Sequence, residues 1–391
     1  MEKVRYGIIG IGNMGIVHLK HFFEGKIENG VCTAIADLNE EKLRVAREKY
    51  PADYEVFARG EDLIDNAKVD AVIVAVPHYD HPALSIRAMK RGLHVVCEKP
   101  AGVYTKQVKE MNAVAAECST LFTMMYNQRT NPLYIKMREI LASVEFGEIR
   151  RVNWIITNWF RTQFYYDSGS WRATWKGEGG GVLLNQCPHQ LDLLQWICGM
   201  MPTKIRAFCH FGKWHKIETE DDVTAYMEFP NGATGSFVTT TADAPGTNRL
   251  EITTSRGRMI CERDRLTVSR FTEGDLQDFL NNSPEAFVKP KAVDEVFEQC
   301  PERNTQHVGI LNNFSNAILG KEKLYVDGRE GINCVQLMDA MLLSTFKDKT
   351  VTLPIDDDEY WEELSRRIAT SSIKEGGDKL IDNTSSFGGT K

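Results

Sequence analysis

Short apolar runs recur through the first third of the chain, and a segment of helical periodicity follows most of them. The runs cover residues 6–9, 31–36, 69–76, 93–97 and 121–125. Strands that are apolar on both faces are typical of parallel sheets covered by helices on both sides. The alternation of strand and helix predicts a doubly wound α/β sheet, and hence a Rossmann domain, over residues 1–126.

The pattern changes beyond residue 126. A helix is predicted over 131–141, and six later segments alternate between apolar and polar positions: 151–159, 204–211, 222–229, 234–241, 249–254 and 257–262. Alternation of this kind indicates an antiparallel sheet with one buried and one wet face. We therefore predict an α+β domain with a large, mostly antiparallel open sheet over residues 127–370.

Three other stretches differ from these strands. The polar residues 272–304 predict an insertion or an extended loop, whereas helical spacing returns at 307–319 and 332–346. Residues 371–391 are rich in Gly, Ser, Thr, Asp and Lys, and this composition predicts a mobile tail.

The first predicted strand leads into a glycine-rich turn, Gly10-Ile11-Gly12-Asn13-Met14-Gly15, of the form G-x-G-x-x-G. The first glycine permits the tight turn, the second lets a pyrophosphate approach the backbone, and the third lets helix and strand pack closely. The N-terminus of the following helix favours the negative charge of phosphate. The turn therefore predicts a dinucleotide site that includes Asn13 and Met14. The alternative is a unit whose glycines serve packing alone.

Asp37 ends the second predicted strand, 22 residues beyond Gly15. A carboxylate at this spacing accepts a hydrogen bond from the ribose 2′-hydroxyl and repels a 2′-phosphate. The cofactor we predict is therefore NAD.

Two later strands also end in polar residues. Residues 69–76 lead into Pro77 and then His81, and residues 93–97 lead into Glu98 and Lys99. Ligands of open α/β sheets bind beyond the carboxyl ends of the strands. We expect Pro77 and His81 to line the cofactor crevice and Lys99 to lie near the nicotinamide. His81 has an equally good interpretation as the first residue of a helix.

A glycine run at 179–181 precedes a helix that is predicted to begin near Asn185 or Gln186. Asn185, His189 and Asp192 are spaced i, i+4 and i+7, so they share one face of this helix, opposite its apolar face. Together they form a candidate substrate site. The structural alternatives are a helix-capping Asn185, a buried structural His189 and an exposed surface acid at Asp192.

Aromatic residues and arginines are concentrated just before the glycine run. Tyr165, Trp171 and Arg172 are the members that we expect to contact substrate. Aromatic faces beside hydrogen-bonding groups suit sugar rings. Packing within the core or at an interface is the alternative for each of them.

Composition narrows the class of protein. The 391 residues favour two domains, and the net charge of −7 gives no electrostatic reason to expect nucleic acid or anionic membrane as a partner. No apolar run is long enough to span a bilayer, and the charged N-terminus is unlike a secretory signal. Nine irregularly spaced cysteines favour a reduced, cytoplasmic protein, and the HxxH pairs lack further ligands, so no metal site is predicted.

These motifs resemble the Gfo/Idh/MocA oxidoreductases, the relatives of glucose–fructose oxidoreductase and inositol dehydrogenase. The resemblance covers nearly the whole chain. It rests on GIIGIGNMG (7–15), GLHVVCEKP (92–100), Asn127 with Arg129 and Pro132, Trp171-Arg172, and GGGVLLNQCPHQLDLLQWICG (179–199). It implies that Lys99 and His189 act at the reacting carbon, that Asp192 is a second acid, and that Glu98 and Asn127 lie at the cofactor. It also implies that the second domain binds substrate and supports a homodimer or homotetramer.

The chain departs from the family pattern in two places. Asn185 stands where many members have Asp, and Cys187-Pro188 stands where Gly is usual. Asn cannot carry charge, but its amide can still form hydrogen bonds with a hydroxylated substrate. The run NQCPHQLDL is similar to members that act on sugars and glycosides, including those that oxidise the C3 hydroxyl.

The reaction predicted is hydride transfer between NAD and a secondary hydroxyl, with C3 as a candidate position, of a sugar, glycoside or polyol. His189 is the expected base and a protonated Lys99 the expected stabiliser of the alkoxide. A Lys99 of lowered pKa is the alternative base. Two other functions use the same fold: a redox-neutral enzyme that retains NAD and cleaves glycosides, and a non-catalytic NAD-binding sensor.

Overall fold

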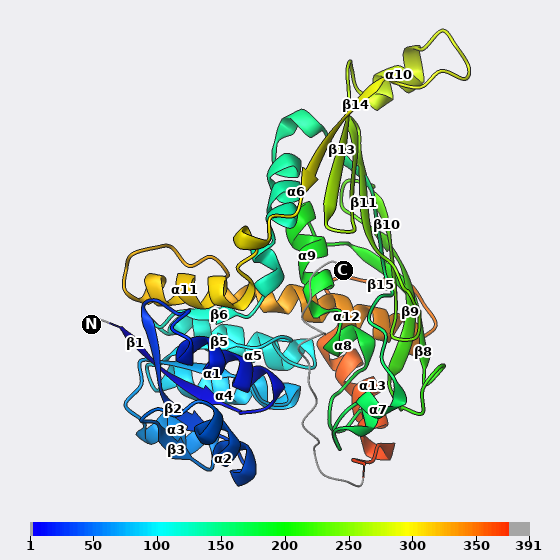
Figure 1. The fold of residues 1–391 in the computed structure, drawn as a ribbon. Coiled ribbons are helices and arrows are strands. Elements are labelled where there is room, and N and C mark those ends of the chain that lie inside the picture. The colour runs from blue at the N-terminus through cyan, green and yellow to red at the C-terminus, as the bar shows by residue number, and fades with distance from the viewer. Residues whose placement is uncertain (1–2, 375–391) are drawn as a thin grey trace.

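The computed structural model describes residues 3–374 and contains two sheets with helices around and between them (Figure 1). The first sheet is parallel throughout and has the order β3-β2-β1-β4-β5-β6. Its strands are β1 (Val4–Ile9), β2 (Gly30–Ala36), β3 (Glu55–Phe57), β4 (Ala71–Val74), β5 (His94–Cys97) and β6 (Phe122–Met124). The predicted doubly wound sheet is confirmed, and only the short, exposed β3 was missed.

The order of the strands reverses between β1 and β4, and a crevice opens there beyond their carboxyl ends. Helices connect the strands: α1 (Asn13–Phe23), α2 (Glu40–Lys49), α3 (Gly60–Asn66), η1 (His78–Asp80), α4 (His81–Lys90) and α5 (Thr105–Glu117). The start of α2 shows how local sequence sets an element. The Asn39 side chain accepts from the backbone N–H groups of Glu41 and Lys42, which caps the helix.

The second sheet has nine strands in the order β14-β13-β12-β11-β7-β10-β9-β8-β15. They are β7 (Ile149–Ile156), β8 (Lys204–Phe211), β9 (Glu220–Glu228), β10 (Thr234–Thr240), β11 (Asn248–Thr254), β12 (Gly257–Glu262), β13 (Arg265–Phe271), β14 (Ala292–Glu298) and β15 (Val351–Thr352). Every neighbouring pair is antiparallel except β7 and β10. The mostly antiparallel sheet is therefore confirmed.

The prediction of an extended loop over residues 272–304 is wrong in part. This stretch contains α10 (Leu276–Asn282), the strand β14 and the short η4 (Pro301–Arg303), and α10 projects beyond the end of the sheet (Figure 1). All but one of the residues of β14 are exposed. The strand therefore has no buried face, and no alternation of apolar and polar residues marks it in the sequence.

Helices cover the inner face of the second sheet and fill the space beside the first. The elements are η2 (Asn127–Thr130), α6 (Pro132–Ala142), η3 (Val144–Phe146), α7 (Gln163–Asp167), α8 (Val182–Asn185), α9 (Pro188–Cys198), α11 (Gln306–Ile318), η5 (Gly328–Glu330), α12 (Gly331–Phe346) and α13 (Asp357–Thr370). The almost completely buried α12 packs on β8 and on α9. It joins the two parts of the molecule into one core.

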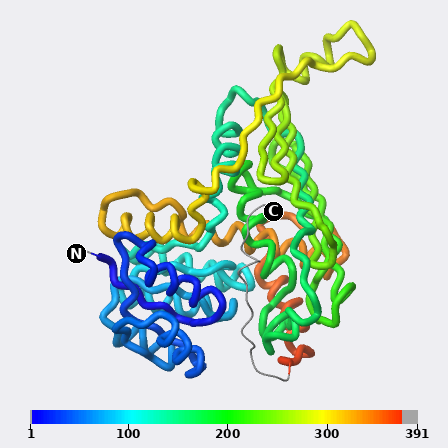
Figure 2. The backbone as a smooth tube through the Cα atoms, viewed as in Figure 1, coloured from blue at the N-terminus to red at the C-terminus, as the bar shows by residue number. Residues whose placement is uncertain are grey.

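Helix α11 lies against the first sheet although it follows the second in sequence. Figure 2 shows this orange segment beside the blue N-terminal strands, and α11 contacts β2 and η2. The hydroxyls of Tyr6 and Ser315 are 2.7 Å apart in a buried hydrogen bond.

The predicted mobile tail, residues 371–391, lies outside the described residues from 375 onward. The four residues before that point contact the second part of the molecule. The Ser371 hydroxyl donates to Glu218 at 2.5 Å, and the Lys374 backbone N–H donates to the Ser170 carbonyl at 3.0 Å. The boundaries after residues 126 and 370 stay predictions.

Candidate active site

One cavity of about 1030 Å³ lies between the first sheet and the helices of the second part. Its volume is at the upper end of the roughly 300–1,000 Å³ typical of ligand pockets, so a cofactor and a substrate have room together. Of the predicted site residues, those that line it are Gly10, Gly12, Asn13, Met14, Asp37, Pro77, His81, Glu98, Lys99, Asn127, Tyr165, Trp171, Arg172, Asn185 and His189.

The glycine-rich turn between β1 and α1 forms one end of this cavity. Gly10 has a φ of +89°, and a Cβ there would lie 2.4 Å from the Ala75 carbonyl oxygen. A Cβ on Gly15 would lie 1.8 Å from the Gly10 oxygen, so Gly15 packs beneath the turn and does not line the cavity. A Cβ on Gly12 would meet nothing within 4 Å, and no side chain caps the start of α1. This open turn and its uncapped amides fit a pyrophosphate.

Asp37 directly follows β2 and faces the same end of the cavity. Its Oδ2 accepts from the Ile11 backbone N–H at 2.7 Å, and its Oδ1 accepts from that of Asn39 at 2.8 Å. These two bonds hold the carboxylate in place. Each oxygen keeps lone-pair capacity for a ribose hydroxyl, so the residue fits the adenosine ribose of NAD.

Pro77 and His81 line the middle of the cavity, beyond β4. His81 also begins α4, which was the alternative interpretation of this residue. Its contact with a cofactor stays a prediction. Its ring nitrogens lie 2.7 Å from the Pro100 carbonyl oxygen and 2.8 Å from that of Val76. Burial lowers the pKa of His81. The neutral ring has a single N–H and donates to one of the two carbonyls.

Glu98 directly follows β5 and is held by a buried histidine. Its Oε1 lies 2.7 Å from His18 Nε2. Burial raises the pKa of this carboxyl, but the hydrogen bond and charge of His18 outweigh it and bring the pKa to about 2. Glu98 is therefore an ionised group directly beside Lys99.

Asn127, the other residue expected at the cofactor, begins η2. Its side chain donates to Gln306 Oε1 at 2.5 Å.

Lys99 and His189 reach the cavity from the two different parts of the fold. Lys99 Nζ donates to the backbone carbonyl of Asn185 at 2.8 Å, which ties the end of β5 to α8. Burial lowers the pKa of Lys99, whereas Glu98 and Glu178 oppose that shift. The pKa of His189 is well below 6.5, first because of burial and then because Lys99 and His307 lie close to it. A neutral imidazole thus shares the cavity with a lysine.

The helix expected to start near Asn185 is interrupted. Helix α8 ends at Asn185, and α9 begins at Pro188 with the proline in its first turn. Most of α9 is buried, so the face predicted to carry Asn185, His189 and Asp192 is not a solvent-exposed face of this helix.

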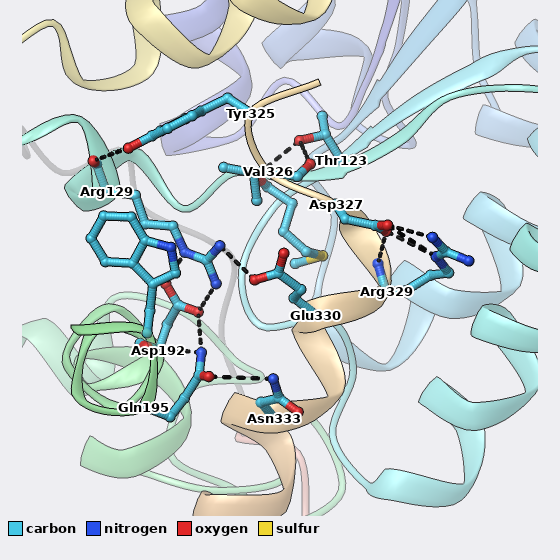
Figure 3. Close-up of polar contacts among 12 residues, drawn as sticks. Thr123, Arg129, Asp192, Gln195, Tyr325, Val326, Asp327, Arg329, Glu330 and Asn333 are labelled. Carbon is cyan, nitrogen blue, oxygen red and sulfur yellow. Dashed lines mark hydrogen bonds and ion pairs between the residues drawn. The ribbon is translucent and has the colours of Figure 1, made fainter. Parts of the chain in front are cut away.

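The structural alternative for Asp192, an exposed surface acid, is wrong. The Asp192 side chain is 1% exposed and forms a bidentate ion pair with Arg129, with distances of 2.8 and 2.6 Å (Figure 3). Arg129 also contacts Glu330 at 2.7 Å. Asp192 is not among the residues that line the cavity. Its predicted role in binding substrate stays a prediction.

Aromatic and polar groups from the second part of the molecule form another wall of the cavity. The Arg172 guanidinium lies 4.6 Å from the ring centres of both Tyr165 and Trp171, and it donates to the Tyr165 hydroxyl at 2.9 Å. Gln186 donates to the same hydroxyl at 3.2 Å. The wall offers flat apolar faces with hydrogen-bonding edges.

Several residues of the site were missed in the sequence. Gln186, Gln190 and His307 line the cavity, and Glu178 contacts the cavity residue Asn185. Trp159, one of the aromatic residues before the glycine run, also lines it. His307 comes from α11, which packs back onto the first sheet, so no local motif marks it. Within residues 3–374, no group of His, Cys, Asp or Glu is placed to hold a metal. In the same residues no helix is long and apolar enough to cross a membrane.

Comparisons with known proteins identify the family of both parts of the chain. Residues 4–126 match the family described as "Oxidoreductase family, NAD-binding Rossmann fold", and residues 134–260 match "GFO/IDH/MocA C-terminal domain". The chain is similar to the myo-inositol 2-dehydrogenase of Thermotoga maritima, with 26% identity over 69% of this chain and 78% of the relative. It is 27% identical to the rhizopine catabolism protein MocA of Rhizobium meliloti over 53% of this chain, and the match spans 61% of that relative.

Solved structures share the fold over most of the chain. The WlbA dehydrogenase of Bordetella pertussis, solved with NADH and UDP-GlcNAcA, has a TM-score of 0.75 at 24% identity and covers 90% of this chain and 100% of its own. A levoglucosan dehydrogenase solved with NADH has a TM-score of 0.76 at 19% identity, with coverage of 90% and 100%. These neighbours support the two-part architecture.

Proposed function

Because this chain belongs to the GFO/IDH/MocA oxidoreductase family, we propose that it oxidises a secondary hydroxyl of a sugar, glycoside or polyol with NAD. One observation carries the proposal. Lys99 and His189 face the same cavity as the glycine-rich turn and Asp37. When bound, NAD accepts a hydride from the substrate carbon, so the protein must hold the alcohol and remove its proton.

His189 is the base in this proposal. Its lowered pKa, caused first by burial and then by Lys99, keeps the ring neutral near pH 7. A neutral imidazole can accept the hydroxyl proton as the hydride leaves.

Lys99 orients the hydroxyl and stabilises the charge that develops on its oxygen. One N–H of a protonated Nζ is committed to the Asn185 carbonyl, which leaves two for the substrate. A charged donor in a site shielded from water stabilises an alkoxide strongly.

The wall of Tyr165, Trp171 and Arg172 supports a carbohydrate-like substrate, because rings with apolar faces and hydroxyl edges match it. The relatives named above as inositol and levoglucosan dehydrogenases also act on polyhydroxylated rings by their names. Within this class we propose the C3 hydroxyl of a glycoside, from the similarity of residues 185–193 to members that oxidise this position.

The test is a spectrophotometric assay. The purified protein is mixed with NAD and a panel of sugars, glycosides and polyols, and NADH is followed by its absorbance. His189→Ala and Lys99→Met should each lower kcat by about 10²–10⁴-fold with NAD affinity unchanged. His210→Ala, a matched change at an exposed histidine on β8, should leave turnover unaltered. Turnover close to wild type in both site variants would refute the assignment.

Mass spectrometry of the same mixtures separates the two other functions. A cleaved glycoside without net NADH indicates a redox-neutral enzyme, in which the retained NAD takes up a hydride and later returns it. Unchanged substrates with NAD bound to the protein indicate a sensor.

A further inference from the structure

A carboxylate lies buried directly behind the substrate side of the cavity. Glu178 belongs to the loop before α8, its residue is 2% exposed, and it does not line the cavity. Burying a carboxylate is costly unless its oxygens find partners. The contacts of this group therefore show what it does.

Both oxygens of Glu178 are engaged. Oε2 accepts from the Ala173 backbone N–H at 2.5 Å, and Oε1 accepts from the side-chain amide of Asn185. Burial raises the pKa of Glu178, while the positive charges of Arg172 and Lys99 act in the opposite direction. The carboxylate thus lies among two cations and an amide that all line the cavity.

The glycine run lets this loop pack tightly enough to bury Glu178. Gly179 has a φ of +87°, and a Cβ on it would lie 2.2 Å from Val103 Cγ1. A Cβ on Gly181 would lie 2.0 Å from the backbone oxygen of Glu220. Larger residues at these two positions would push the loop away from Asn185.

The hydrogen bond decides how the Asn185 amide is oriented. An ionised carboxylate only accepts hydrogen bonds, so the nitrogen of this amide must face Glu178. The backbone carbonyl of Asn185 already accepts from Lys99. The side-chain Oδ1 is then the atom of Asn185 that can accept a hydrogen bond from a hydroxyl in the cavity.

We propose that Glu178 is a positioning residue for the reaction: it holds the Asn185 amide with Oδ1 toward the substrate hydroxyls and partly neutralises the cations Lys99 and Arg172. This inference rests on the proposed function. Glu178 touches no substrate itself, and it acts through Asn185 and through its charge.

The first test is Glu178→Gln, which keeps the shape and removes the charge. The carboxylate accepts one hydrogen bond on each oxygen, from Ala173 and from Asn185. A Gln side chain has a single oxygen and can accept from only one of these two groups at that geometry, so the Asn185 amide loses its fixed orientation. We expect kcat/KM to fall by about 10- to 100-fold through misplacement of the substrate. Affinity for NAD should not change. Urea unfolding of the variant verifies that it is folded.

A second measurement needs no substrate. The rate at which acetic anhydride labels Lys99 is followed against pH by mass spectrometry, with the exposed Lys106 as internal reference. Loss of the Glu178 charge should lower the apparent pKa of Lys99, because this carboxylate favours the protonated lysine. Glu220→Gln is the matched control, because Glu220 is equally buried but accepts from the backbone of Gly181 and Leu183. Glu220→Gln should leave the pH dependence of Lys99 labelling unchanged.

Moving the carboxylate provides a rescue experiment. Asn185→Asp alone places two carboxylates in contact, which disfavours ionisation of both and should reduce activity. The double variant Glu178→Gln/Asn185→Asp restores one carboxylate opposite one amide. We expect it to recover kcat/KM relative to either single variant.

Three results bear on the proposal separately from the proposed function. The proposal is overturned if Glu178→Gln has wild-type kcat/KM and an unchanged pH dependence of Lys99 labelling. It is also overturned if Glu178→Gln loses activity, Asn185→Asp fails to rescue that activity, and the pH dependence of Lys99 labelling is unchanged. If wild type oxidises nothing in the panel, the proposed function fails, and the labelling of Lys99 still decides the link to Glu178.

Discussion

Replacing Asp192 by Asn removes one charge from a buried ion pair that joins two elements of the candidate active site. Asp192 follows His189 on α9, and Arg129 follows Asn127 on η2. Both side chains are 1% exposed, and two short hydrogen bonds connect them. The pair therefore holds the helix that carries His189 against the segment that carries Asn127.

The magnitude follows from burial. Removing one partner of a buried ion pair costs about 3–5 kcal/mol, because the other charge is left without compensation. Glu330 remains 2.7 Å from Arg129, but this carboxylate is 39% exposed. We therefore expect Asp192→Asn to lower the free energy of unfolding by about 3 kcal/mol, at the lower end of that range.

A matched control lies nearby in Figure 3. Arg329 and Asp327 also form an Arg–Asp pair, at 2.5 Å, but their side chains are 54% and 37% exposed. Exposed pairs contribute about 0.2–1 kcal/mol. Asp327→Asn should therefore lower the free energy of unfolding by less than about 1 kcal/mol, and Asn can still cap η5 as Asp327 does.

The assay is urea unfolding followed by tryptophan fluorescence, since Trp196 lies 5.4 Å from the Arg129 guanidinium. Equal losses in the two variants would refute the reasoning, as would a loss below about 1 kcal/mol for Asp192→Asn. If Asp192 instead contacts substrate, as the sequence resemblance implies, Asp192→Asn should raise KM without this loss of stability.

The remaining predictions concern the cofactor and pH. Asp37→Ser should raise the ratio of kcat/KM for NADP to that for NAD by at least about 10-fold, since the carboxylate that repels a 2′-phosphate is gone; an unchanged ratio would contradict the role of Asp37. Burial lowers the pKa of His307 to about 3 from 6.5, so the unfolded state takes up a proton first as pH falls, and stability should decline below about pH 6.5. In His307→Gln the loss between pH 7 and pH 5 should be smaller by up to about 2 kcal/mol in urea unfolding, and an identical pH dependence would count against a neutral buried His307. If His189 is the base, the acid limb of kcat/KM should lie below pH 6.5, because its folded pKa is lowered; a limb at or above 6.5 in the pH–rate profile would exclude this assignment.

Much of the first sheet and of its cofactor end could be predicted from local sequence. The turn Gly10–Gly15 and the strand that ends at Asp37 each depend on backbone geometry and burial within a short segment. The chemistry of these positions is also local, because the carboxyl ends of neighbouring parallel strands always meet at one edge. For the same reason Lys99 could be placed at this edge, where it lines the cavity.

An element without such a signal, and the packing of a helix that was predicted, could not be found from the sequence. Strand β14 has no buried face, and so it shows no alternation. Helix α11 has a clear helical pattern, but nothing in that pattern tells which sheet it covers. Its return to the first sheet brings His307 into the cavity.

The sequence by itself determined the order and type of most elements, the glycine-rich turn and the residues able to carry the chemistry, because periodicity and backbone freedom act over a few residues. The tertiary structure alone decided which of those side chains meet. It turned Asp192 toward Arg129, brought Lys99 to the carbonyl of Asn185, and buried Glu178 behind the amide of the same residue. These contacts join residues that are far apart in the chain or that become buried only when the chain folds. In the buried, low-dielectric interior, the neighbours of each ionisable group then determine its pKa and hence its charge.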